Sequence, residues 1–342
     1  EREIDSVAGD VLVQWDKRKD TAEGYQLDIT SENLELRKAK ASANVGLAVN
    51  VQTPEKRAAP VSGHIKLSGD VKNAVVAQVK EFIPAFTPAA AHAWLDRALL
   101  RGDINGQVKI DGPLRGFPYA EKQGVFSADV NAQNGGLQFA EEWPELNAIG
   151  ADLSFRNFGL SGKLRSAVTA GAKVENLTIN IPNLRKAEVA VVAQGDFPLS
   201  DMLNYVRSSP LRTPVEPLLK GLSVSGQGKL NLALNVPVAD VNNVSVDGAL
   251  TLNSARLHSS EILQLKGVKG TINFDRSRVL AQDIEAQFHG FDSVAQLDIG
   301  LNESDDRIIT ATSKMDLESH PEQHAFLNRF LPTWFLDMLS GS

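Results

Sequence analysis

Alternation of aliphatic and polar residues recurs along most of this 342-residue chain. In the clearest run, Leu230, Leu232, Leu234 and Val236 share one parity, with small or polar residues between them. Successive side chains of a β-strand point to opposite faces of the sheet, so such a run has one aliphatic and one polar face. This pattern is typical of antiparallel sheets with water on one side, and it predicts a mainly β protein.

Further runs with the same alternation lie on both sides of this one. Their aliphatic members are Val45, Leu47, Val49 and Val51; Ile104, Val108 and Ile110; Ile149, Ala151, Leu153 and Phe155; and Leu297, Ile299 and Leu301. Because Gly, Pro, Asn and Asp favour turns, we expect the strands to break at certain clusters of these residues. The expected breaks are Asp111-Gly112-Pro113, Asn134-Gly135-Gly136 and Asp247-Gly248.

Segments with helical spacing interrupt the strands. In the first, an apolar stripe begins at Val75, and Thr87-Pro88 then supplies an N-cap and a first-turn proline for a second helix. We expect that helix to stop at Gly102. A second segment repeats the design between Pro198 and Gly221, so a pair of short helices is predicted at each place.

The helical segments recur at a regular spacing. Thr87-Pro88 recurs as Thr213-Pro214, an offset of 213 − 87 = 126, and Phe82-Ile83-Pro84 recurs as Phe330-Leu331-Pro332, an offset of 330 − 82 = 248. The second offset is close to twice the first, which predicts a repeat unit of about 125 residues. The expected divisions are a strand segment at 1–70, a unit at 71–196 with its helical pair at 72–101, a second unit at 197–315 with its helical pair at 198–220, and amphipathic helices that start a third unit at 316–342.

Composition argues against several classes of function. The net charge is −7 without a basic block, so nucleic acid is not an expected partner. The chain has no cysteine, and His320 and His324 flank Glu322 without forming a metalloprotease motif. We therefore expect no enzyme activity, no metal site and no cofactor. No apolar run approaches the roughly 18 residues of a membrane-spanning helix, no signal peptide leads the chain, and we interpret it as a piece of a longer protein.

A series of short motifs resembles the central region of YhdP-type proteins, a branch of the AsmA-like family. The motifs, in the order of that family, are Phe82-Ile83-Pro84, Trp94-Leu95-Asp96-Arg97-Ala98-Leu99, Gly116-Phe117-Pro118-Tyr119, Gly124-Val125-Phe126, Trp143-Pro144-Glu145-Leu146, Ser209-Pro210-Leu211, Gly226-Gln227-Gly228-Lys229-Leu230 and Val236-Pro237. The similarity covers residues 71–342, and residues 1–70 fit only in general character.

This resemblance implies an elongated, curved antiparallel sheet that forms an open, trough-like groove with a few short capping helices. Proteins of this kind are similar to the bridge-like lipid transfer proteins. They are anchored in the inner membrane, cross the periplasm, and are implicated in moving phospholipid toward the outer membrane, whose permeability barrier they support. The resemblance therefore implies contacts with both membranes through segments that this chain lacks, and with envelope proteins that it does not identify.

We expect the aliphatic parity to line the groove. An acyl chain gains about 0.8 kcal/mol for each methylene removed from water, and an open trough leaves the charged headgroup solvated. The predicted lining residues are Val45, Leu47, Val49, Ile104, Val108, Ile110, Ile149, Leu153, Phe155, Leu230, Leu232, Leu234, Val236, Val268, Ile272, Phe274, Leu297 and Ile299.

Other readings of the same alternation stay open. The aliphatic face could be a conventionally packed core in a structural or interaction scaffold of the cell envelope. A glycan-binding domain would need exposed aromatic residues, and with 4 Trp and 3 Tyr it is poorly supported.

Overall fold

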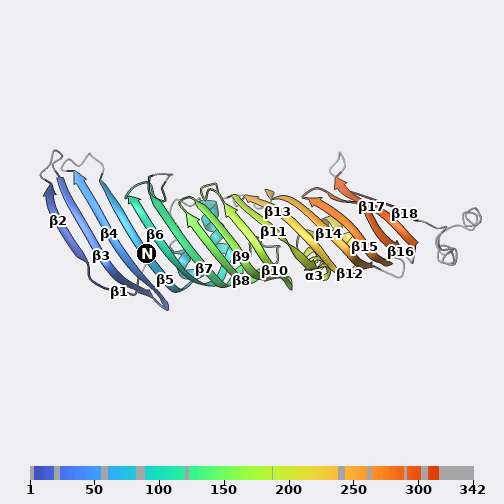
Figure 1. Cartoon of the computed structure of the whole chain (residues 1–342), viewed down its shortest axis with the longest axis horizontal. Coiled ribbons are helices and arrows are strands. Elements are labelled where there is room, and N and C mark those ends of the chain that lie inside the picture. Colours follow the sequence, from blue (N-terminus) through green and yellow to red (C-terminus); the bar gives the residue numbers. More distant parts are fainter. Residues whose placement is uncertain are drawn as a thin grey trace, which may run out of the picture. The chain divides into compact units, whose positions relative to one another are not determined.

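The computed structural model describes residues 4–18, 24–54, 61–81, 89–119, 123–186, 188–237, 243–259, 264–288, 291–301 and 307–315. These residues are mostly in β-strands, as the alternation predicts (Figure 1). Contacts divide the chain into two compact units. Unit 1 comprises Glu1–Thr169, Lys173–Val191 and Asn235–Asn243, and unit 2 comprises Ala170–Ala172, Val192–Leu234 and Val244–Ser342. This division by contacts does not test the sequence repeat, which stays a prediction.

Unit 1 is an open antiparallel sheet whose strands follow chain order. Its strands are β1 (Ser6–Ala8), β2 (Leu12–Arg18), β3 (Gly24–Lys38), β4 (Ala41–Pro54), β5 (Ser62–Val75), β6 (Leu99–Pro113), β7 (Val125–Leu137), β8 (Leu146–Arg156), β9 (Gly159–Thr169) and β10 (Ala172–Ile181). From β2 to β9 each strand pairs with the next one along the chain. β1 and β2 pair with different halves of β3, and β10 pairs with β9.

Unit 2 is built in the same way. Its strands are β12 (Ser223–Ser225), β14 (Ser245–His258), β15 (Gln264–Asp275), β16 (Val279–Phe288), β17 (Phe291–Leu301) and β18 (Arg307–Met315). β12 pairs with β14, and β14 to β18 pair consecutively, all antiparallel. β11 (Glu188–Pro198) and β13 (Gln227–Pro237) contribute residues to both units.

Short helices occur at the two predicted places within the described ranges. They are α1 (Val76–Lys80), α2 (Ala89–Ala98), α3 (Leu199–Arg207) and α4 (Arg212–Leu219). The start after Pro198 is confirmed, and Gly221 follows α4 with φ +68°. The predicted stop at Gly102 is wrong, because α2 ends at Ala98 and Gly102 lies inside β6. Thr87-Pro88 and the third helical segment lie outside the described residues.

Two of the predicted breaks at glycine-rich clusters are also wrong, because Asn134-Gly135-Gly136 and Asp247-Gly248 lie within β7 and β14. The break at Asp111-Gly112-Pro113 is confirmed, because β6 ends at Pro113. The bare glycines also make room for neighbouring rings. A Cβ atom on Gly248 would lie 2.2 Å from the ring of Phe274, and one on Gly112 would lie 2.7 Å from the ring of Tyr119. Glycine in these strands therefore serves close packing and not only chain reversal.

Bulges bend the strands of both units. In unit 1 the pairing register shifts in β3, β5, β7 and β8, and in unit 2 it shifts in β14, β15 and β16. Left-handed residues accompany several of these shifts, as at Asn73, Asn134 and Ala148. A bulge bends its strand and increases the local twist. The result is a curved sheet in each unit, as expected.

The helix α3 packs onto the sheet of unit 2. Leu199 lies in a buried cluster with Ala255 and Val268, and its side chain occupies the space beside Gly228, where a Cβ atom would lie 2.6 Å from it. Small residues beneath a helix let its backbone approach the sheet closely. Unit 2 therefore has a conventionally packed core over part of its aliphatic face.

Candidate functional site

The strand register brings aliphatic side chains into rows that cross unit 1 on one face. Residues directly opposite one another on paired strands share a face of the sheet. One such row is Val45, Gly69, Val108, Ala128, Phe155 and Leu160, and the next is Ala43, Val71, Gly106, Val130, Leu153 and Gly162. A third row is Leu47, Leu67, Ile110 and Phe126. We call this surface the aliphatic face of unit 1.

The predicted lining residues of unit 1 all lie on this face. Val49 is opposite Ile65, Ile104 is opposite Ala132, and Ile149 is opposite Gly135; the others belong to the three rows above. The sequence reading left out Ile65, Leu67 and Val130, although Ile65 and Leu67 share a parity within β5. A search for shorter alternating runs could have found them.

In unit 2 the predicted residues also share a face, but two of them are buried. Ile272 and Leu297 are both opposite Ala281, and Phe274 and Ile299 are both opposite Val279. Val268 is 2% exposed and Ile299 is 1% exposed. On β13, Leu230, Leu232, Leu234 and Val236 continue the parity of Gly228, which contacts Leu199 and Leu250. Their contact with lipid stays a prediction.

The large side chains on the aliphatic face of unit 1 are partly exposed, whereas Val268 and Ile299 of unit 2 are buried. Val45, Val108, Val130, Leu153 and Phe155 are each partly exposed. Among the described residues of unit 1, the buried aliphatic side chains are mainly small ones or lie near the helices: Ala74, Val76, Ala98, Ala151, Leu164 and Ala167. The large side chains in the middle of the face thus remain accessible to an apolar ligand.

Helices border this face at one end of the strands, which we call the helical edge. Val76 of α1 is 8% exposed and lies over Gly102, where a Cβ atom would be 3.2 Å from its Cγ2. The indole Nε1 of Trp94 in α2 donates a hydrogen bond to the carbonyl oxygen of Phe139, at 2.7 Å. The backbone N–H of Gln138 donates to the carbonyl of Ala98. These bonds tie α2 to the connection between β7 and β8.

At the opposite end of β6, residues 114–119 fold back over the strand ends, and we call this segment the strap. Leu114 packs against Gly63, and its N–H donates to the carbonyl of Gly63. Tyr119 is 1% exposed, with its ring against both Gly112 and Gly124. Phe117 contacts the rings of Tyr119 and Phe126 at centroid distances of 5.8 and 5.0 Å. The strap edge is therefore a packed border of the aliphatic face.

The other face of unit 1 is polar and hydrogen-bonded across the strands. Asp129 accepts hydrogen bonds from Ser154 (2.7 Å) and from Arg156, and these bonds lower the pKa of its carboxyl group. Cross-strand bonds to side chains also lower the carboxyl pKa of Asp28 and Asp152 on this face, and that of Asp298 in unit 2. Exposed carboxylates fully engaged with water and neighbouring donors make this face unsuitable for acyl chains.

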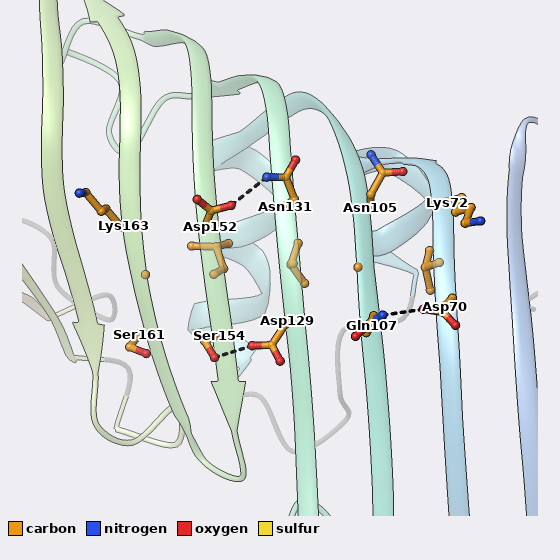
Figure 2. Close-up of a pocket in the computed structure, with 15 residues that line it drawn as sticks. Asp70, Lys72, Asn105, Gln107, Asp129, Asn131, Asp152, Ser154, Ser161 and Lys163 are labelled. Carbon is orange, nitrogen blue, oxygen red and sulfur yellow. Dashed lines mark hydrogen bonds between the residues drawn. The ribbon is translucent and has the colours of Figure 1, made fainter.

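One hollow of unit 1 is walled by the polar side chains of this face (Figure 2). It has a volume of about 810 Å³ and is widely open to solvent. Figure 2 shows its walls, in which Asp129, Asn131 and Asp152 come from adjacent strands. Val71, Val130 and Leu153 of the second aliphatic row also line it, each between two polar residues of its strand, whereas Val108 and Phe155 of the first row do not. Because charged and amide side chains form its walls, we do not assign the lipid site to this hollow.

Lowered carboxyl pKa values predict how stability depends on pH. Asp28, Asp129, Asp152 and Asp298 have folded pKa values below their ordinary value, so the stability that they contribute is present above the unfolded pKa and is lost as pH falls through the folded pKa. We expect the urea midpoint to stay level from roughly pH 8 to 5 and to fall below about pH 4. In the Asp129→Asn variant the urea midpoint should fall less as the pH drops below about 4. A pH profile identical to that of the unaltered chain would contradict a stabilising role of the Asp129 carboxylate.

The structure shows neither a membrane-spanning helix nor a metal-binding cluster in its described part. No helix there combines the length and apolar character needed to cross a bilayer. No group of three or more His, Asp or Glu side chains among the described residues is arranged to hold a metal ion. His320 and His324 lie outside these residues.

Comparisons with known proteins agree on one family. The family model described as YhdP protein matches residues 4–342. The intermembrane phospholipid transporter YhdP of Escherichia coli strain K12 is 26% identical over 197 residues, which cover 57% of this chain and 16% of that relative. No solved structure matches the chain significantly. An open antiparallel sheet with a family match over nearly its whole length leads to one conclusion: the chain belongs to the YhdP protein family.

Proposed function

We propose that this chain is a periplasmic segment of an inner-membrane-anchored protein that conducts phospholipids between the inner and outer membranes and so supports the outer-membrane permeability barrier. The observation that carries the proposal is the open aliphatic face of unit 1, whose large side chains stay partly exposed. The similarity to an intermembrane phospholipid transporter supports the choice of ligand. In this function no residue performs chemistry, and the protein is not an enzyme.

The dimensions of the aliphatic face suit an acyl chain. From Ile104 to Ile110 the strand advances 110 − 104 = 6 residues, about 20 Å at the usual rise of about 3.4 Å per residue. One leaflet of a bilayer has hydrocarbon about 15 Å deep. An acyl chain can therefore lie entirely on the face, gaining about 0.8 kcal/mol for each methylene that it buries.

A groove of this kind permits movement as well as binding. Its rows contain only aliphatic and aromatic side chains and glycine, so a bound chain meets no polar group that would hold it in one register. An acyl chain that slides along the rows then replaces each apolar contact with an equivalent one. We infer one-dimensional diffusion of lipid across the strands of unit 1.

A second function, a structural scaffold of the cell envelope, has one observation in its favour. In unit 2, α3 and the sheet form a buried core that includes Leu199, Ala255 and Val268. If unit 1 were covered in the same way by another protein, its aliphatic face would be an interaction surface rather than a conduit.

Organic extraction and mass spectrometry of the purified chain test the two functions. We expect phospholipid in a defined molar ratio to protein, above the amount carried by an unrelated β-protein purified from the same host. Val108→Asp should remove that excess, because the carboxylate would interrupt the central row. Protein that is purified without phospholipid, and that takes up none when it is incubated with vesicles, would favour the scaffold.

A further inference from the structure

The strap edge of unit 1 carries arginines beside aromatic rings. Arg115 is exposed within the strap, two residues before Phe117, whose ring contacts Phe126 on the aliphatic face. Arg185 lies in the segment that follows β10, with its guanidinium 4.1 Å from the ring centre of Phe158. Arg185 thus combines an exposed cation with an aromatic surface, and Arg115 is a second exposed cation in the segment that carries Phe117.

The two arginines lie at the same edge of the sheet. The end of β6 lies beside the start of β7, because Asp111 pairs with Val125. The end of β8 pairs with the same part of β7. Arg185 is held there because the N–H of Leu184 donates to the carbonyl of Phe158, in the turn between β8 and β9. Four strand spacings of about 4.8 Å separate β6 from β10, or about 19 Å, so the two cations form separate positions along one edge.

The helical edge has the opposite character. Asp96, Glu141 and Glu142 are exposed there. Two of its cations are engaged: Arg101 is paired with Glu145, and the Lys80 ammonium donates to the carbonyl of Asp96. An anionic group would meet carboxylates at this border.

Among the described residues the strap edge has fewer acidic groups, and two of them already bind cations or donors. Asp111 is bonded to His64 at 2.7 Å, and Asp129 is bonded to Arg156, both on the polar face. Glu188, at the start of β11, is the remaining described acid near Arg185 in the chain. The strap edge therefore favours an anion more than the helical edge does.

We propose that the strap edge binds the phosphate headgroup of a phospholipid whose acyl chains lie on the aliphatic face of unit 1, with Arg115 and Arg185 as successive phosphate contacts. This inference rests on the proposed function and adds the orientation of the lipid. A guanidinium binds phosphate through paired, charge-assisted hydrogen bonds. Aromatic rings suit the boundary between acyl chain and headgroup because they are apolar with polarisable faces. The headgroup stays at the solvated rim, so its charge is never buried.

Vesicles of two compositions test this orientation on the complete chain. One contains dioleoylphosphatidylglycerol, and the other adds dioleoylglycerol, which has the same acyl chains without phosphate, to a neutral carrier. The measured quantity is lipid bound per chain after flotation. For the variant with both Arg115→Glu and Arg185→Glu, we expect about a tenfold loss of bound phosphatidylglycerol, with binding of dioleoylglycerol unchanged.

The control is Arg97→Glu, an exposed arginine in the last turn of α2 at the helical edge. It changes the net charge of the chain by the same amount as either of the two substitutions at the strap edge, and it should leave phosphatidylglycerol binding unchanged. An equal loss in the control, or undiminished binding in the double variant, would overturn the assignment of the headgroup to the strap edge.

Two further outcomes separate this inference from its foundation. An unaltered chain that binds neither lipid would refute the proposed function and the orientation with it. If the unaltered chain binds both lipids and the double variant binds each of them equally well, only the orientation would be refuted. Displacement of phosphatidylglycerol by millimolar inorganic phosphate would identify a site for free phosphate and would also overturn the proposal.

Discussion

Ala128→Asp is expected to reduce phospholipid bound to the chain by about tenfold or more. Ala128 lies in the central row of the aliphatic face, directly opposite Val108 and Phe155. A carboxylate there stays hydrated and keeps water beside the row. Loss of contact with two methylenes at about 0.8 kcal/mol each already accounts for a tenfold change in affinity. The measurement is phospholipid per chain after loading from vesicles.

The neighbouring residue supplies a matched control. Ser127 lies in the same strand on the opposite face, where it is paired with Lys109 and Arg156. Ser127→Asp adds the same charge to the same strand, next to two cations, and should leave lipid binding unaltered. Both variants should unfold in urea close to the unaltered chain, because Ala128 and Ser127 are partly exposed. Equal lipid binding by the two variants would refute the aliphatic face of unit 1 as the binding surface.

Tyr119→Ala is expected to lower the free energy of unfolding by about 3–5 kcal/mol, the range for deleting a large buried ring. Tyr119 is 1% exposed, and its ring fills the space above Gly112 and Gly124. Neither glycine can fill the cavity that the substitution leaves. Urea denaturation, followed by the loss of β-sheet circular dichroism, measures the effect.

Tyr119→Phe serves as the control because it keeps the ring and removes only the hydroxyl group. Burial, followed by the nearby charge of Asp111, raises the pKa of that hydroxyl, so it is neutral at ordinary pH and its removal deletes no charge. We expect this variant to remain within about 1.5 kcal/mol of the unaltered chain. If Tyr119→Ala were as mild as Tyr119→Phe, the strap would not be a packed border of unit 1.

Local pattern was enough to predict the strands and their faces. The parity of Val45, Leu47 and Val49 assigned them to one face, and the register with Ile65 and Leu67 confirms that assignment. A strand has only two faces, so a single alternating run contains this information. The helix start after Pro198 is equally local, because proline is favoured at such positions.

Glycine was misread because its role depends on distant residues. Gly248 resembles a turn residue until the ring of Phe274 is seen to occupy the space above it. Gly102 resembles a helix terminator, yet it lies within β6 beneath Val76. In each case the neighbour comes from another element, and no short window of sequence contains both partners.

The sequence by itself determined that this chain has a two-faced antiparallel sheet, with Leu153 and Val268 both on its aliphatic side. Only the tertiary structure decided that Leu153 stays partly exposed, whereas Val268 is buried with Leu199 of α3. Alternation records which side of a strand is apolar, because that depends on backbone geometry alone. Whether that side contacts another part of the protein or is left for a ligand depends on where the helices pack, and this is a property of the folded chain.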